Sequence, residues 1–325
     1  MKKICLSLFF AVFIVLFGCK GKKNDSVPSI SEGYVTVEEG VELRYKTIGD
    51  GPDAVLIPAA IYLEYEFEKL ADKNRTLIFY DQRGRGKSSK VADKSEISMD
   101  IEISDLEALR QHFGKEKVSL IGWSYLGGLV ILYADRYPEH VNRVIQTGPI
   151  SPTYDLFMKS TVVPMDKEDA AKLKQMQEEK LQETDPEAYR TEFWNITMKR
   201  AFHDPEKIGQ FRTDIAKCEN EMPQNVNFLL MAIIYSLEKW DWREQVNDLD
   251  IPVLTIQGEQ DTLPMEGAQA WVSSLPDARL LTVPESGHLP FVEQPEIFFP
   301  AVDTFLRGGW PEEAVIISDS EDANR

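Results

Sequence analysis

The sequence predicts an α/β protein, with a mostly parallel central sheet, helices on both of its faces and an inserted helical cap. Short apolar runs that are rich in branched residues and bounded by glycine, proline or charge are typical of strands buried on both faces. Six such runs occupy residues 54–58, 76–80, 118–122, 143–147, 252–258 and 279–284. Segments of helical length separate most of them, and this alternation predicts parallel strands joined by right-handed crossovers.

Other patterns in the sequence predict the first two strands and the main helices. Two alternating runs, 34–37 and 41–47, flank "EEG" and predict a hairpin at the edge of the sheet. Helices are predicted over 101–114, 125–138, 265–275 and 296–306. The first of these has apolar residues at a spacing of about 3.6 and ends at Gly114.

The alternation of strands and helices is interrupted between residues 151 and 247. That segment is helical in pattern and strongly charged, and the next buried-strand run begins only at residue 252. We therefore predict an inserted helical cap over 151–247, which divides the core into 34–150 and 248–307. The acidic end, 308–325, is predicted to be a disordered tail.

The N-terminus has the pattern of an export signal. Lys2 and Lys3 precede an apolar run over 8–17, which is shorter than the roughly 20 residues needed to span a bilayer. The following "LFGC" resembles the bacterial lipobox, in which the cysteine is acylated and becomes the new N-terminus. We predict a signal peptide over 1–18, lipid attachment at Cys19 and a tether over 19–33. A plain cleaved signal and an uncleaved anchor are the alternatives.

These features predict a protein of the bacterial cell envelope, exported and lipid-anchored. The formal net charge of −18 repels nucleic acid and anionic membrane surfaces and favours cationic ligands, so membrane contact is expected through the lipid anchor only. Once Cys5 and Cys19 are set aside, Cys218 remains alone in the folded body, which excludes an intrachain disulfide and a cysteine zinc site. The expected partner is a small molecule or a short peptide; the oligomeric state does not follow from these patterns.

The stretch "GWSYLGG" places Ser124 between a predicted strand and a predicted helix. A serine in such a turn is held in a strained backbone conformation with its hydroxyl exposed, and Gly122 permits the close approach of the helix to the strand. Leu126 stands where turns of this kind usually have glycine, and the two glycines that follow it could let the helix approach at another angle. The alternative role for Ser124 is a helix N-cap.

A serine nucleophile needs a base and an acid from elsewhere in the chain. Of the four histidines, His288 lies in a glycine-bearing loop directly after the last predicted strand, where α/β sheets present site residues. The other three, His112, His140 and His203, are interpreted as surface or capping residues. Asp261 follows the strand at 252–258 and could orient the imidazole of His288, with Glu259 as its competitor.

The chain order Ser124, Asp261, His288 matches that of the α/β-hydrolases. The body from residue 34 to about 306 resembles that superfamily, and within it the prolyl aminopeptidase (proline iminopeptidase) branch. The stretch "FYDQRGRGKSS" at 79–89 resembles the D-x-R-G-x-G-x-S loop of the branch, and "GHLPFVEQPE" resembles its histidine segment. The resemblance implies catalysis by these three residues with no metal and no organic cofactor.

The resemblance also implies an oxyanion hole and a substrate site in the cap. In the branch, a His-Gly-Gly-Pro-Gly segment follows the third strand; here "PAA" at 58–60 takes its place, so Ala60 and Tyr125 are the expected N–H donors. Acidic cap residues of the branch hold the amino terminus of the substrate. That role is open here to Glu192, Glu219, Glu221 or other acidic cap residues, whose alternative is a solvated helical face.

Two classes of function, with three candidates in all, remain open from the sequence. The first is a serine hydrolase that cleaves an amide or ester through an acyl-enzyme, with an aminopeptidase on small proline-terminated peptides ahead of a small-ester carboxylesterase. The competing class is a non-catalytic ligand-binding protein on a hydrolase fold, since the altered turns at 58–60 and 124–128 depart from the branch pattern.

Overall fold

The computed structural model describes residues 28–317. These residues contain one eight-stranded sheet and the helices around it. The strands are β1 (Ile30–Glu38), β2 (Val41–Ile48), β3 (Asp53–Pro58), β4 (Arg75–Tyr80), β5 (Val118–Trp123), β6 (Val141–Thr147), β7 (Val253–Gly258) and β8 (Ala278–Val283). Their order across the sheet is β1-β2-β4-β3-β5-β6-β7-β8. The pairs β1–β2 and β2–β4 are antiparallel and all other pairs are parallel, which confirms the predicted α/β class.

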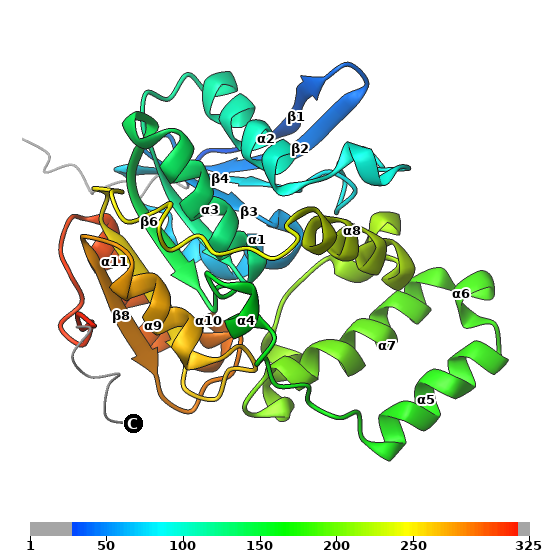
Figure 1. Cartoon of the computed structure of the whole chain (residues 1–325). Helices are drawn as coiled ribbons and strands as arrows, with labels where there is room; N and C mark the ends of the chain where they lie inside the picture. The colour runs from blue at the N-terminus through cyan, green and yellow to red at the C-terminus, as the bar shows by residue number, and fades with distance from the viewer. Residues whose placement is uncertain (1–27, 318–325) are drawn as a thin grey trace, which may run out of the picture.

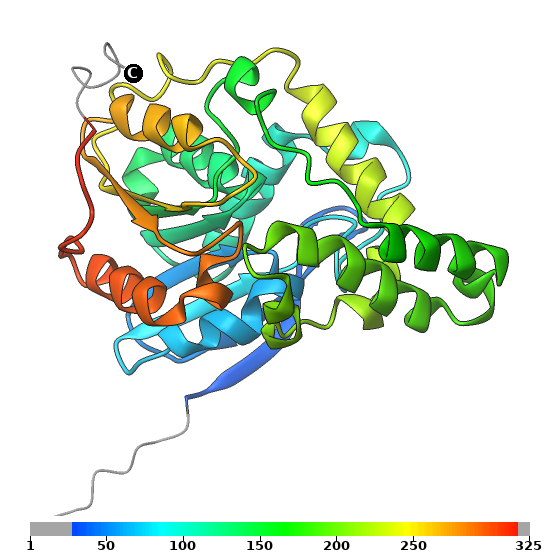
Figure 2. The same ribbon diagram turned by 90° about the horizontal axis from the view of Figure 1, so that it is seen from below.

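Helices cover both faces of the sheet (Figures 1 and 2). One face carries α2 (Met99–His112), α3 (Tyr125–Arg136) and α9 (Met265–Ser273); the other carries α1 (Ala60–Phe67), α10 (Pro290–Glu293) and α11 (Pro295–Leu306). An aromatic cluster joins the helices of the second face: Phe67 packs edge-to-face on Phe291, Phe298 and Phe299. Such pairs add directional contacts to the burial of large apolar surfaces.

The inserted cap connects β6 to β7. It contains α4 (Tyr154–Phe157), α5 (Lys167–Glu178), α6 (Leu181–Thr184), α7 (Pro186–Met198) and α8 (Pro223–Ser236), with several short 3-10 turns between the last two. Figure 1 shows α5, α6 and α7 projecting beyond the sheet, while α8 lies closer to α1 and α3. The helical character predicted for this segment is confirmed.

Two predicted boundaries were wrong. The tether was expected to reach residue 33, but β1 begins at Ile30, because residues 30–33 pair in register with 45–48 of β2. The disordered tail was expected from residue 308, but Leu280 and Val315 exchange two backbone hydrogen bonds of 2.8 Å, and Ala314 is buried. The chain therefore adds a short antiparallel bridge to β8, the edge strand.

The expected signal over 1–18, the lipid attachment at Cys19 and the acidic residues from 318 onward lie outside the described residues. Over residues 28–317, no helix has the length and apolar character required to cross a bilayer.

Candidate active site

Ser124 has a backbone conformation that side-chain-bearing residues rarely adopt, with φ 61° and ψ −130°. Three backbone hydrogen bonds hold it there: its N–H donates to Thr147 at 2.9 Å, and its carbonyl accepts from Gly127 and Ile150, both at 3.0 Å. The hydroxyl makes no capping hydrogen bond to α3. This argues against the N-cap alternative and leaves the oxygen available at a strained turn.

The glycines around Ser124 explain how Leu126 is tolerated. A Cβ at Gly122 would lie 2.2 Å from the carbonyl oxygen of Leu126, so β5 and α3 meet at this point. The close approach to the chain after β6 occurs at the next two positions, where a Cβ at Gly127 would lie 2.7 Å from Pro149 and one at Gly128 would lie 2.8 Å from Ile150. The glycines that the turn requires are therefore 122, 127 and 128, and Leu126 lines a cavity instead.

Asp261 and His288 form a buried pair. Nδ1 of the imidazole lies 3.0 Å and 2.9 Å from the two carboxylate oxygens, and the Asp261 side chain is 1% exposed. The carboxylate also accepts the N–H of Leu263 at 2.9 Å, which fixes its orientation. With the Nδ1 proton directed at the carboxylate, Nε2 carries the lone pair of the neutral ring.

Two backbone contacts fix the loop that carries His288. Its N–H donates to the carbonyl of Ala201 in the cap at 2.7 Å, and its carbonyl accepts Nε1–H of Trp123 at 2.8 Å. The indole of Trp123 also packs against the imidazole, with ring centroids 5.2 Å apart. Trp123, the residue before the candidate nucleophile, thus positions the histidine, and sequence reasoning missed this role.

Gly148 is a second residue that sequence reasoning missed. It has φ +49°, and a Cβ there would lie 2.8 Å from Asp261 Oδ2 and 2.8 Å from His288 Nδ1. Its position directly after the 143–147 run could have indicated a place near the site, because the carboxyl ends of parallel strands meet at one edge of the sheet.

The remaining sequence candidates lie elsewhere. The side chain of Glu259 contacts Gln260 at 3.1 Å, so it does not compete for His288. His140 lies 3.4 Å from Glu107, His112 packs on Phe113, and His203 is exposed. Among residues 28–317, no group of three or more histidine, cysteine or acidic residues has the arrangement of a metal site.

Ser124 and His288 line the same cavity, which has a volume of about 250 Å³. The core contributes Ala59, Trp123, Tyr125 and Leu126, and the cap contributes apolar side chains from α7 and α8 and the turn between them: Met198, Ala201, Val226 and Leu230. Three further core residues supply its polar wall: Tyr62, Gln82 and Arg85. Mostly apolar walls with a few polar groups are typical of small-molecule sites.

Two helix starts border this cavity. Ala59 is in the left-handed conformation, with φ 64° and ψ 48°, and this turn begins α1 at Ala60. Ala60 and Tyr125 are the first residues of α1 and α3, and the first N–H groups of a helix have no intrahelical acceptor. Ile61, one residue further, donates its N–H to Asp81 at 2.8 Å. Both predicted oxyanion donors therefore stand where the N–H has no intrahelical acceptor. Tyr125 lines the cavity, whereas Ala60 is fully buried and follows Ala59, which lines it.

A buried polar chain lies behind Tyr125. Its hydroxyl accepts Nε2–H of Gln82 at 2.7 Å and donates to Glu102 at 3.3 Å. Burial, reinforced by the nearby charge of Asp105, raises the pKa of Glu102 to about 8, so its carboxyl group is mostly protonated at pH 7.

The three acidic cap candidates do not line the cavity. Glu192 pairs with Lys172 at 2.5 Å, and Glu219 pairs with Lys90 at 3.1 Å, both on the surface side. Glu221 is fully buried and forms an ion pair of 2.8 Å with Arg85. Glu221 therefore lies neither on a solvated face nor at an open site for an amine.

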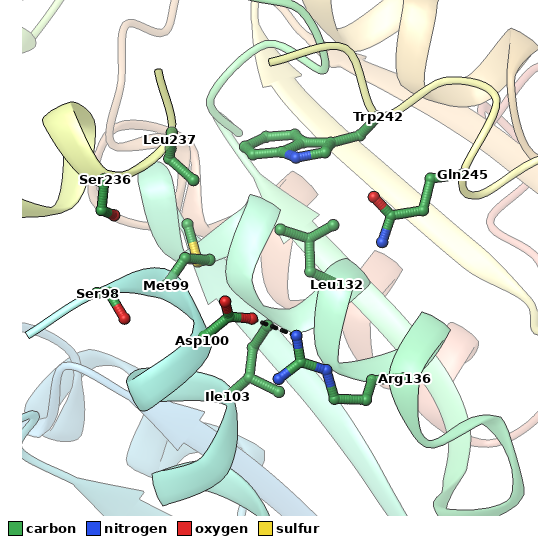
Figure 3. A pocket seen from close by; sticks show the side chains of 10 residues that line it. All are labelled: Ser98, Met99, Asp100, Ile103, Leu132, Arg136, Ser236, Leu237, Trp242 and Gln245. Atoms are coloured by element: carbon green, nitrogen blue, oxygen red, sulfur yellow. Dashed lines mark hydrogen bonds and ion pairs between the residues drawn. The ribbon is translucent and has the colours of Figure 1, made fainter. Parts of the chain in front are cut away.

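A second pocket of about 290 Å³ lies where α2, α3 and the end of α8 meet (Figure 3). Its charged residues, Asp100 and Arg136, form an ion pair with each other. Met99, Ile103 and Leu132 supply its apolar side. The pocket contains none of the three predicted catalytic residues.

The chain is similar to curated proteins over most of its length. The chain is 26% identical over 314 residues to a proline iminopeptidase of Saccharolobus solfataricus, covering 86% of this chain and 93% of that protein. It is also 26% identical over 288 residues to a putative 2-succinyl-6-hydroxy-2,4-cyclohexadiene-1-carboxylate synthase of Bacillus subtilis, covering 84% and 97%.

Solved structures share the fold. An esterase from Exiguobacterium antarcticum superposes with a TM-score of 0.61 at 21% identity, covering 84% of this chain and 98% of its own. A 2-hydroxy-6-oxo-6-phenylhexa-2,4-dienoate hydrolase from Rhodococcus sp. strain RHA1 gives 0.61 at 19% identity, covering 86% and 99%. Residues 57–295 match the family described as alpha/beta hydrolase fold, which is most of the chain. The chain therefore belongs to the α/β-hydrolase family.

Proposed function

We propose that this protein is a serine hydrolase in which Ser124 attacks the carbonyl carbon of an ester or amide. The observation that carries the proposal is the buried Asp261–His288 pair, at 2.9 Å, whose imidazole lines the same cavity as a serine held at φ 61°. A hydroxyl alone is a weak nucleophile, and an imidazole oriented by a carboxylate supplies the base that it needs.

The proton transfers follow from this arrangement. His288 Nε2 accepts the hydroxyl proton as Ser124 Oγ bonds to the carbonyl carbon, and Asp261 remains ionised and stabilises the imidazolium. The imidazolium then donates this proton to the leaving alcohol or amine. Water, activated by the same imidazole, hydrolyses the acyl-enzyme and restores the free serine. The chain supplies the nucleophile, the base and the carboxylate of these steps, and the substrate and water supply the remaining reacting groups.

The N–H groups of Ala60 and Tyr125 are proposed to stabilise the oxyanion. Both stand at the first position of a helix, where the helix dipole adds to the hydrogen bonds. The absence of glycine at 59 and 60 is compatible with this role, because Ala59 already adopts the left-handed conformation that starts α1. Backbone donors require no particular side chain.

The cavity favours a small, uncharged substrate. Its cap-side residues are apolar, and its volume of about 250 Å³ suits a compact molecule. Among the described residues that line it, none is an aspartate or glutamate. A protonated substrate amine would therefore lack a counter-charge at the cavity wall, which favours an ester or a neutral amide.

A proline-specific aminopeptidase is the second candidate, and the similarity to proteins named proline iminopeptidase favours it. Against it stand the contacts of Glu192, Glu219 and Glu221, each already paired with a basic side chain. An aminopeptidase would have to release one of these carboxylates toward the cavity.

Hydrolysis of two substrate types separates the candidates. We expect the purified protein to hydrolyse 4-nitrophenyl butyrate with a higher kcat/KM than proline 4-nitroanilide. The Ser124→Ala variant should lose at least about 10³-fold in kcat on either substrate. Faster turnover of the anilide would select the aminopeptidase, and full activity of a folded Ser124→Ala protein would exclude the hydrolase mechanism proposed here.

A further inference from the structure

Three residues, Tyr62, Gln82 and Arg85, form the polar wall of the active-site cavity. Arg85 is the charged one. It lies in the loop after β4, five residues past the end of the strand, and its side chain is 11% exposed. Arginine is seldom buried without an anionic partner, because removing its charge from water is costly. The contacts of Arg85 therefore decide what this wall can recognise.

Glu221 is that partner, and it comes from the cap. Its Oε2 lies 2.8 Å from Arg85 Nη2, and its Oε1 lies 3.1 Å from Arg85 Nε. The same Oε1 accepts the N–H of Gly86 at 2.7 Å. Both carboxylate oxygens are thus occupied and fully buried, so Glu221 is not available to a substrate amine.

The hydrogen bonds of Arg85 use only part of its guanidinium. Nε and Nη2 donate to Glu221, and Nη2 also donates to the hydroxyl of Tyr62 at 2.5 Å. Nη1 makes no hydrogen bond with any residue of the described range 28–317. Since the exposed part of Arg85 borders the cavity, a substrate can supply the acceptor for the remaining N–H groups.

The charge balance limits the kind of acceptor. The bidentate pair of Arg85 and Glu221 has a net charge close to zero, and the Glu221 side chain is 0% exposed. A substrate carboxylate would face the buried carboxylate of Glu221 at short range in a poorly hydrated site, where repulsion between like charges is strong. A neutral carbonyl oxygen satisfies Nη1 without that repulsion.

We propose that Arg85 is a specificity-determining residue that donates a hydrogen bond from Nη1 to a neutral carbonyl oxygen in the acyl chain of the substrate. The substrate class is then an ester or amide of a small oxo acid, with one carbonyl at Ser124 and a second at Arg85. This inference rests on the proposed hydrolase function and adds the identity of the acyl group.

The expected effect is a preference between matched esters. A hydrogen bond from a charged donor distinguishes substrates by about 10- to 100-fold in kcat/KM. The probes are the 4-nitrophenyl esters of pentanoate and hexanoate, compared with those of 4-oxopentanoate and 5-oxohexanoate. We expect at least one oxo ester to exceed its parent ester by that factor, and the mono-4-nitrophenyl ester of glutarate, which carries a carboxylate, to be the poorest.

The variants are chosen so that folding does not obscure the result. Arg85→Met alone leaves Glu221 buried without a counter-charge, so the double variant Arg85→Met with Glu221→Gln is measured beside it. Glutamine at 221 retains an acceptor for Gly86. The ratio of kcat/KM between oxo and parent esters should fall to about 1 in the double variant and stay unchanged in Lys87→Met, an exposed change in the same loop.

The outcomes separate this inference from the function on which it rests. If the native protein hydrolyses the parent esters but shows no preference for either oxo ester, the assignment of Arg85 is wrong and the hydrolase proposal stands. A preference that persists in the double variant, or a preference for the glutarate ester, also overturns it. Failure to hydrolyse any ester or amide would count against the hydrolase proposal itself.

Discussion

Replacing Gly148 by alanine tests whether the geometry of the Asp261–His288 pair controls activity. The new Cβ would lie 2.8 Å from both Asp261 Oδ2 and His288 Nδ1, whereas ordinary contacts begin at 3.4 Å. One or both groups must therefore move by about 0.6 Å. A displacement of about 1 Å in a catalytic group can cost on the order of 100-fold, so we expect kcat/KM to fall by about 10- to 100-fold.

Stability should fall as well, for two separate reasons. Alanine at φ +49° adopts the left-handed conformation at a cost of roughly 1–2 kcal/mol. Crowding of a packed site adds about 1–3 kcal/mol. Urea denaturation measures the sum, and hydrolysis of a 4-nitrophenyl ester measures kcat/KM on the folded protein.

Gly114→Ala is the matched control. Gly114 has a similar φ, +59°, but a Cβ there would meet nothing within 4 Å. The variant should show only the backbone cost of roughly 1–2 kcal/mol and retain native kcat/KM. If folded Gly148→Ala is as active as Gly114→Ala, the contact between residue 148 and the pair does not matter for the reaction, and the reasoning fails.

Two further predictions concern pH and the N-terminus. Between pH 4.5 and about 8, Glu102 keeps its proton in the folded state but is ionised in the unfolded state. Through this group the free energy of unfolding falls as pH rises, by at most about 1.4 kcal/mol per pH unit. Glu102→Gln should therefore flatten the fall of unfolding free energy over that range in urea titrations; an unchanged slope would contradict the buried, protonated state. The lipid attachment predicted at Cys19 should appear as incorporation of an alkyne-labelled fatty acid in the full chain expressed in bacteria. Cys19→Ser should abolish the label, and a label that survives this change would exclude Cys19 as the site.

The strands and the candidate triad could be predicted because their signals are local. A buried parallel strand is a short apolar run, and the residues after such runs gather at one edge of the sheet. The stretch from residue 60 to 67 gave no such signal. It is a helix in which Glu64 and Glu66 are buried. Each pairs with an arginine distant in the sequence, Arg44 or Arg212. A charged residue in a sequence pattern usually indicates a solvated face, so these two gave the wrong indication.

The parts that sequence reasoning missed depend on long-range contacts. Arg85 and Glu221 are 136 positions apart, and only folding shows that the cap carboxylate meets this arginine and not a substrate amine. The bridge between Leu280 and Val315 is formed by backbone groups, so no side-chain pattern marks it. Gly148 gave a weak signal by its place after a strand, but its contact with Asp261 and His288 required the register of β6 and β7.

Labelling with a fluorophosphonate tests the central claim most directly, because the reagent reacts with a serine only when a neighbouring base activates it. Peptide mass spectrometry of the labelled protein should locate the adduct on Ser124, and the His288→Ala variant, folded by circular dichroism, should react at least about 10³-fold more slowly. A native protein that folds and binds ligands but leaves Ser124 unlabelled would contradict the account and support the non-catalytic alternative.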